Sequence, residues 1–140
     1  METINRECYV SLEVAKLLKQ AGFDWPTHYS YDLYLYSTEG EKRVIDGFAP
    51  TFCNEHNGLA SMPTLEVAQR WLREVKGIHI CVKADAASIN CKYFVAVIIS
   101  DTKWGNVQDE NKKSILFNTY EEAQEAGIKK ALEIILEKEE

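Results

Sequence analysis

Apolar residues recur at helical spacing in three segments of the chain. The segments run from Ser11 to Gly22, from Thr64 to Gly77, and from Thr119 toward the C-terminus. Each begins with a hydroxyl residue that can cap the free N–H groups of a first turn, and each has Glu in that turn, where the helix dipole favours negative charge. The pattern predicts three helices, the first two ended by a left-handed glycine.

Each predicted helix gathers its apolar residues on one side, which we expect to be its buried face. Phe23 and Ile78 follow the two glycines and are placed to fold back on the last turn of their helices. The predicted core faces comprise Val14, Leu17, Leu18 and Ala21, then Val67, Ala68, Trp71, Leu72 and Val75, and finally Ala123, Gly127, Ile128, Ala131 and Ile135.

Between the helices the apolar period falls to two, which is typical of strands. Tyr93–Ile99 is apolar on both faces and is therefore expected at the centre of a sheet. The predicted strands are Tyr31–Ser37 and Lys42–Phe48, joined as a hairpin, then 78–83, Tyr93–Ile99 and Ser114–Phe117, with long loops at Ala49–Pro63 and Asp101–Lys113. These elements predict an α+β fold with an antiparallel-rich sheet of about five strands and three helices, in the order α-ββ-α-βββ-α.

Length and composition agree with one globular domain over residues 1–140, because domains typically run ~100–200 residues. The hydrophobic fraction of 46% and the charged fraction of 27% exclude a disordered or collagen-like chain. The net charge is −6, and residues 119–140 contribute seven acidic against three basic side chains. Such a field disfavours free nucleic acid as a partner, since binding requires Lys and Arg to displace counterions.

Four cysteines without a C-x-x-C pair are too few for a stapled secreted scaffold. The first nine residues lack the apolar core of a signal peptide, and no apolar run approaches the ~20 residues that span a bilayer. We therefore expect a cytoplasmic protein with no membrane association.

The hairpin and the last helix supply a candidate protein interface. Alternation places Tyr34 and Tyr36 opposite the leucines of their strand, so this tyrosine pair is expected to face outward. Exposed tyrosines give contact area at low entropic cost, although ordinary β propensity also accounts for them. Glu133 and Glu137 on the acidic helix could meet a basic partner. An exposed hairpin edge also allows a homodimer.

A candidate nucleic-acid face lies on the solvent side of the second helix, where Arg70, Arg73 and Lys76 are spaced at three-residue intervals. A solvated helix face is the plain alternative. The start Thr119-Tyr120-Glu121-Glu122-Ala123 after a strand pair resembles HicB-type antitoxins, and this resemblance implies a nucleic-acid-associated regulator as an alternative function.

A candidate loop site combines Cys53, His56 and Trp104. The spacing Cys53-x-x-His56 is the one metal-like pair in the chain, but a structural zinc site needs about four ligands, so we predict no metal and no cofactor. A Cys and a His brought together could also act as a nucleophile and its base. No glycine-rich phosphate loop occurs. A small hydrolase or transferase using Cys53 and His56 is the third functional alternative.

Three further segments carry a resemblance that covers most of the chain: residues 9–18 (YVSLEVAKLL), 25–29 (WPTHY) and 63–74 (PTLEVAQRWLRE). Through these segments the chain resembles an uncharacterised group of short proteins from gut anaerobes and their phages. The resemblance implies a mobile-element origin and brings no activity or site residues. The function favoured by the sequence is a small, non-enzymatic, protein-binding or regulatory module.

Overall fold

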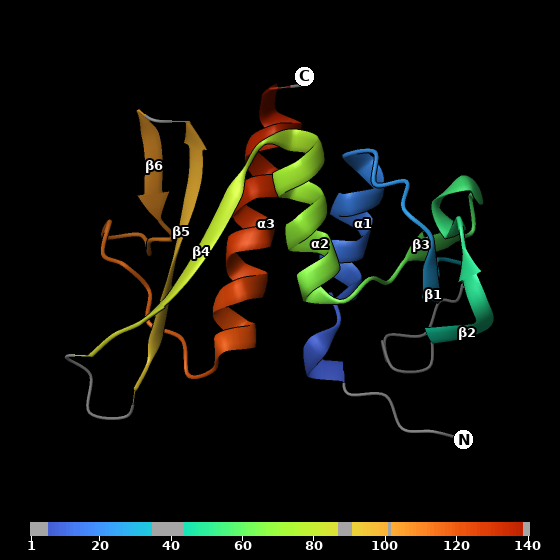
Figure 1. Cartoon of the computed structure of the whole chain (residues 1–140), viewed down its shortest axis with the longest axis horizontal. Coiled ribbons are helices and arrows are strands. Elements are labelled where there is room, and N and C mark those ends of the chain that lie inside the picture. The colour runs from blue at the N-terminus through green and yellow to red at the C-terminus, as the bar shows by residue number, and fades with distance from the viewer. Residues whose placement is uncertain (1–5, 35–43, 87–90, 101, 139–140) are drawn as a thin grey trace. The chain divides into compact units, whose positions relative to one another are not determined.

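The computed structural model describes residues 6–34, 44–86, 91–100 and 102–138 (Figure 1). The chain divides into two compact units, Met1–Glu66 and Val67–Glu140, and each holds a three-stranded antiparallel sheet. The predicted α+β class with three helices and antiparallel pairing is confirmed. The strands nevertheless form two sheets rather than one, because β1 pairs only with strands of the first unit and β5 only with strands of the second.

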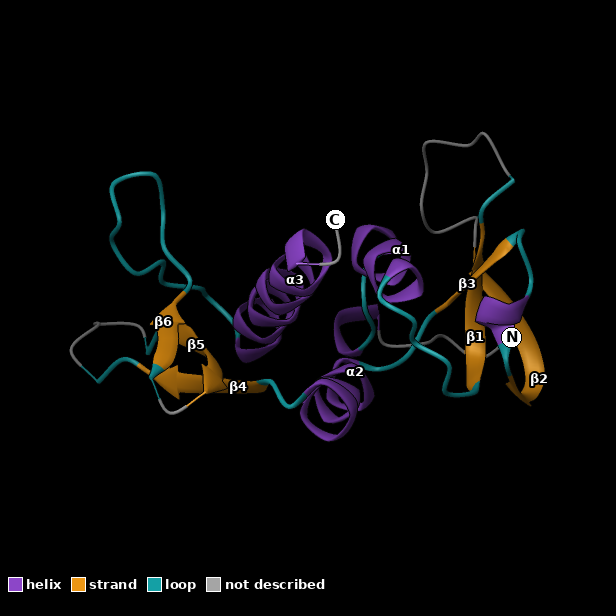
Figure 2. Ribbon diagram, turned by 90° about the horizontal axis from the view of Figure 1, so that it is seen from above, coloured by secondary structure: helices purple, strands orange, loops and turns teal. Residues whose placement is uncertain are grey.

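The first unit packs one helix with a sheet of order β2-β1-β3, seen in Figure 2. Its elements are η1 (Arg6–Cys8), α1 (Leu12–Gln20), β1 (Thr27–Asp32), β2 (Val44–Thr51), the short 3-10 turn η3 (Cys53–Glu55) and β3 (Leu59–Ser61).

The predicted ends of α1 are confirmed. The hydroxyl of Ser11 accepts a hydrogen bond from the Val14 N–H at 3.3 Å, which caps the first turn. Gly22 has φ +94, a left-handed conformation that a side chain would strain. The Phe23 N–H then donates to the carbonyl of Leu18 at 2.9 Å and closes the helix.

The expected hairpin is shifted along the chain. β1 begins at Thr27 rather than Tyr31 and pairs with β2, while Tyr36 lies outside the described residues. Tyr31 is buried near the end of β1, where its hydroxyl donates to the carbonyl of Val10 at 2.7 Å. The second partner of β1 is β3, which lies inside the expected loop Ala49–Pro63. Three residues with one apolar alternation give no periodic signal, so only tertiary pairing identifies this strand.

The second unit packs one long helix across a sheet of order β4-β5-β6. Its elements are α2 (Leu65–Trp71, which begins at the boundary between the units), one π-helical turn η4 (Leu72–Lys76), β4 (His79–Ala84), β5 (Tyr93–Ser100), β6 (Lys103–Asn106) and α3 (Tyr120–Lys138).

The π-helical turn changes the predicted face of the second helix. Trp71 and Leu72 are fully buried as expected, but Val75 is 52% exposed. A π turn holds more residues than an α turn and therefore rotates Val75 off the α-helical stripe. Gly77, at φ +69, ends the segment in the predicted left-handed conformation.

β5 is the central strand, as its apolar pattern predicts. The last strand is a correction: β6 lies inside the expected loop Asp101–Lys113, and the predicted strand Ser114–Phe117 makes only isolated bridges. These bridges join Ser114 to Gln108 and Phe117 to Tyr93. Lys103–Asn106 contains one aromatic residue and a glycine, so its own pattern is too weak to predict pairing with β5.

The buried face of α3 is the predicted one, and it packs against β4 and β5. Gly127 lies against the sheet, where an added Cβ would be 2.6 Å from Cγ2 of Val95 and 2.8 Å from Cγ2 of Ile80. A chain of amide hydrogen bonds supports this packing. Nε2 of Gln124 donates to Oε1 of Gln69 at 2.8 Å, and Nε2 of Gln69 donates to the Ile80 carbonyl at 2.9 Å.

Candidate functional site

The β4-β5-β6 sheet carries apolar side chains on both faces, but the helix of its unit covers only one of them. Gly127 of α3 contacts Val95 and Ile80, so alternate residues of the strands face the helix. Figures 1 and 2 show α3 on that side and no described helix of this unit on the other. The remaining positions form a second surface, which we call the outer sheet face: Cys81, Phe94, Ile98 and Trp104 around the buried Ala96, with His79 and Lys83 on β4.

Strand register brings these side chains into cross-strand rows. Ile98 stands between His79 of β4 and Trp104 of β6, and Phe94 stands opposite Lys83. Trp104 is 68% exposed, whereas Phe94 and Ile98 are half-buried. Neighbouring strands lie about 5 Å apart, so opposed side chains form one continuous surface.

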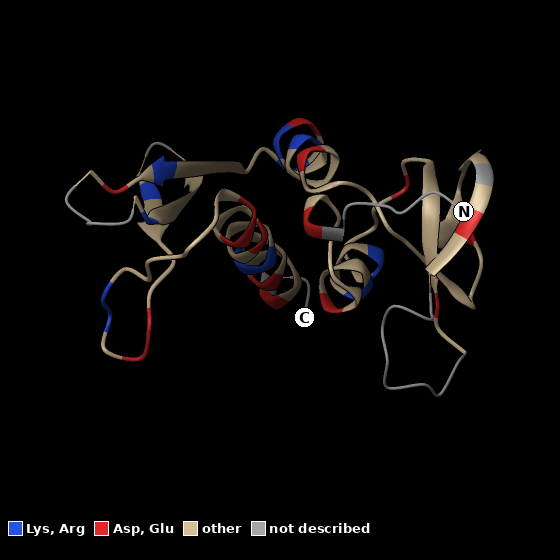
Figure 3. Ribbon diagram, turned by 90° about the horizontal axis from the view of Figure 1, so that it is seen from below, with Lys and Arg blue, Asp and Glu red and all other residues tan. Residues whose placement is uncertain are grey.

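The charge of the three strands is opposite to that of the whole chain. Their only charged side chains are Lys83 and Lys103, and His79 is the only other titratable base. In Figure 3 these strands carry Lys and no Asp or Glu, although the chain has a net charge of −6. The outer sheet face is thus apolar at its centre, with the basic residues His79 and Lys83 of β4 at its margin.

The predicted tyrosine and glutamate interface is dispersed over both units. Tyr34 is 69% exposed, as expected, and its ring lies over Gly58, where an added Cβ would be 2.5 Å from the ring. Tyr36 is not among the described residues. Glu133 is half-buried beside a cavity of about 490 Å³ between α3 and the segment after β6, and Glu137 is exposed near the helix end.

The predicted basic face on the second helix is partly engaged within its own unit. Nε of Arg70 lies 3.0 Å from Oε1 of Glu74, and Nζ of Lys76 lies 5.6 Å from the centroid of the Trp71 ring. Arg73 is exposed. An ion pair and a cation–π contact reduce the positive charge that these side chains present to a phosphate.

The predicted loop site does not come together as a catalytic pair. Cys53 is buried, and its Sγ lies 3.1 Å from Oγ1 of Thr51 and 3.6 Å from Oγ1 of Thr27. His56 is exposed and contacts Cys53 through its backbone N–H, which donates to the Cys53 carbonyl. The described residues contain no group of three His, Cys, Asp or Glu arranged to hold a metal ion. Trp104 belongs to the second unit and to the outer sheet face.

Sequence reasoning missed Phe94 and Ile98 as surface residues. The signal was present, because a strand apolar on both faces needs a cover on each, and only one helix follows it. Within the described part of the chain, no helix is both long and apolar enough to cross a membrane. Comparison with protein families, with curated proteins and with solved structures finds no match for this chain.

Proposed function

We propose that the protein is a non-enzymatic binding module that docks another protein on its outer sheet face. The observation that carries this proposal is the exposed Trp104 in a row with Ile98, on the sheet face opposite the helix. Tryptophan is enriched at the energetic centres of protein interfaces, where it fills a pocket of the partner. A contiguous apolar surface rimmed by polar residues is the usual mark of such a site.

The charge pattern defines the partner. Lys83 lies on the outer sheet face, and the three strands of this sheet contain no acidic residue. A complementary surface is acidic at its edge and apolar at its centre, because like charges facing one another across an interface are strongly unfavourable. The occupant we propose is therefore an acidic, apolar segment of a different protein.

The test compares affinity purifications of matched variants from cells that express the protein. Trp104→Ala removes the exposed aromatic ring, Lys83→Glu reverses the charge at the margin, and Val75→Ala is the control, another exposed apolar residue off this face. A partner with an acidic segment, recovered with wild type and Val75→Ala but lost with the other two variants, supports the proposal. A partner retained by both Trp104→Ala and Lys83→Glu contradicts it.

A second candidate function is supported by the same side chains. Phe94 and Trp104 share a face with Lys83, and aromatic rings beside basic residues on a sheet are the usual platform for stacked, unpaired bases. The readout is the binding of a fluorescent single-stranded oligonucleotide at increasing salt. Binding through phosphates weakens steeply with salt, whereas a protein complex centred on Trp104 weakens far less.

A further inference from the structure

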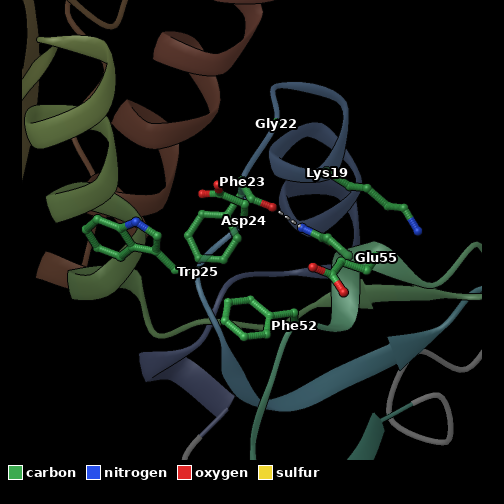
Figure 4. Close-up of a pocket in the computed structure, with 8 residues that line it drawn as sticks. Lys19, Gly22, Phe23, Asp24, Trp25, Phe52 and Glu55 are labelled. Carbon is green, nitrogen blue, oxygen red and sulfur yellow. Dashed lines mark hydrogen bonds between the residues drawn. The ribbon is translucent and has the colours of Figure 1, made fainter.

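The first unit contains a small cavity walled by three aromatic rings, shown in Figure 4. Its volume is about 190 Å³, well below the ~300–1,000 Å³ of pockets for drug-sized ligands. Phe23 and Trp25, just after α1, have ring centroids 6.3 Å apart and planes inclined by 52°. Phe52, just before η3, supplies the third ring and is 53% exposed. The cavity therefore suits a compact group that enters from solvent.

The walls are held in place by hydrogen bonds between distant parts of the unit. Nδ2 of Asn54 donates to the Phe23 carbonyl at 2.9 Å, and Oδ1 of Asn54 accepts from the Ser61 N–H at 2.8 Å. These bonds tie the segment after α1 to η3 and β3. The backbone segments that carry the rings are thus held together before any ligand arrives, which lowers the entropic cost of binding.

Lys19 lines the cavity with its side chain, but its ammonium group is committed elsewhere. Nζ donates to the carbonyls of His56 at 2.6 Å and Leu59 at 2.5 Å. Figure 4 shows this group directed away from the three rings. Its two carbonyl partners therefore hold the ammonium outside the space between the rings.

Two carboxylates remain on the lining. Asp24 and Glu55 flank the rings in Figure 4, and neither has an ion-pair partner among the residues that the structure describes. Aromatic faces carry negative electrostatic potential and attract cations, and carboxylates add to that attraction. The same carboxylates repel phosphates and organic acids. The lining therefore selects for an apolar cation.

We infer that this cavity binds an alkylated ammonium group, through the rings of Trp25 and Phe52 and the charges of Asp24 and Glu55, with the buried Phe23 ring lining the same cavity. An alkylated ammonium is compact, weakly hydrated and apolar at its surface. It can therefore pack against the aromatic rings while its positive charge is attracted to the carboxylates. The group can belong to a free small molecule or to a methylated lysine in a peptide. This inference goes beyond the proposed function and uses residues of the other unit.

The experiment is an NMR titration of the isotope-labelled full-length protein. The probes are choline, its neutral isostere with a tert-butyl group in place of trimethylammonium, and a peptide with one trimethyllysine beside its unmodified form. We expect amide shifts around Phe23 and Phe52 with choline or the trimethyllysine peptide, and weaker ones with the neutral isostere and unmodified lysine. Choline without the peptide identifies a free ligand; the peptide without choline identifies a protein ligand.

Three variants separate the cavity from general surface effects. Phe52→Ala removes an exposed ring, and Asp24→Asn with Glu55→Gln removes the charge; each should weaken binding about fivefold or more. Tyr34→Ala, another exposed aromatic of the same unit, should leave it unchanged. Equal binding of choline and its neutral isostere, or no binding of either cationic probe to the folded protein, overturns the inference. Circular dichroism of each variant confirms that it folds.

Discussion

Gly127 of α3 lies so close to Val95 of β5 that a Cβ at position 127 would stand 2.6 Å from Cγ2 of Val95. This contact sets the distance between helix and sheet and assigns one face of β5 to the helix. Because strand residues alternate, it also assigns Phe94, Ala96 and Ile98 to the opposite face. One close approach in the core thus defines the outer sheet face.

Gly127→Ala should destabilise the protein, although alanine is the better helix former. Helix propensity contributes about 1 kcal/mol in favour of alanine, but overpacking against Val95 and Ile80 costs about 1–3 kcal/mol. Because both contacts would be shorter than 3 Å, the cost lies toward the upper end of that range, and we expect a net loss of about 1–2 kcal/mol in the free energy of unfolding, measured by urea denaturation. Gly105→Ala is the control, because an added Cβ meets nothing within 4 Å there. If Gly127→Ala proves as stable as wild type, the helix is not fixed against β5.

The amide chain from α3 to β4 should contribute to stability as a unit. Gln124→Met keeps the length of the side chain but removes the donor to Gln69, so it should cost about 1–2 kcal/mol. Since Gln124 is buried, water cannot replace the lost bond. In a double-mutant cycle with Gln69→Met, the two losses in the free energy of unfolding should not add. Either substitution alone already removes the hydrogen bond between the two glutamines, so the second one removes less. Additive losses would show that the two glutamines act independently.

Lys19→Met should destabilise the first unit by about 1–2 kcal/mol, because the carbonyls of His56 and Leu59 lose their shared donor. The matched control is Lys16→Met on the exposed side of α1. Chemical denaturation followed by circular dichroism provides the comparison. A loss no greater than that of Lys16→Met would mean that the carbonyls are satisfied by water.

The lowered pKa of Lys19 predicts that the stability of the protein depends on pH. Burial lowers the pKa of Lys19 below its ordinary value of 10.5, so the unfolded chain binds this proton more tightly than the folded chain does. Stability should therefore rise slightly with pH in the window just below 10.5, by an increment that Lys19→Met lacks. The measurement is the difference between the two proteins at each pH. An increment of opposite sign would show that the carbonyl contacts outweigh desolvation.

The cysteines should differ sharply in reactivity. Cys8 and Cys91 are exposed, whereas Cys53 is buried beside two threonine hydroxyls. Because alkylation needs access to the sulfur, iodoacetamide should modify Cys8 and Cys91 quickly in the native protein and Cys53 only after unfolding. Peptide mass spectrometry over time gives each rate. Rapid native modification of Cys53 would revive it as a candidate nucleophile.

The three helices and the central strand were predictable because their signals are local. Ser11 caps a first turn, Gly22 closes a last one, and β5 shows its buried position in its own apolar run. β3 and β6 were not predictable, since three or four residues with little β propensity become strands only through a partner. The division into two sheets depends on which strands pair with one another, and the pattern within a single segment does not contain this information.

The candidate sites follow the same rule. Trp104 is a candidate site residue in the sequence, whereas its cross-strand neighbour Ile98 and, further along β5, Phe94 lie in a strand whose apolar run by itself predicts burial on both faces. The aromatic cavity joins Phe23 to Phe52, which are distant in sequence and meet only through the folding of the loop around Asn54. The positions of Phe23 and Phe52 in the sequence do not predict that the two side chains line one cavity.

Site-specific photo-crosslinking from the outer sheet face tests the proposed function most directly. A photoreactive phenylalanine derivative replaces Trp104 in one sample and Tyr34 in the other, both exposed aromatic positions. The account predicts that position 104 crosslinks to a different protein through an acidic segment, that Lys83→Glu abolishes the crosslink, and that position 34 does not capture this protein. Crosslinking of that protein from position 34 alone, or a crosslink at 104 that persists with Lys83→Glu, would contradict it.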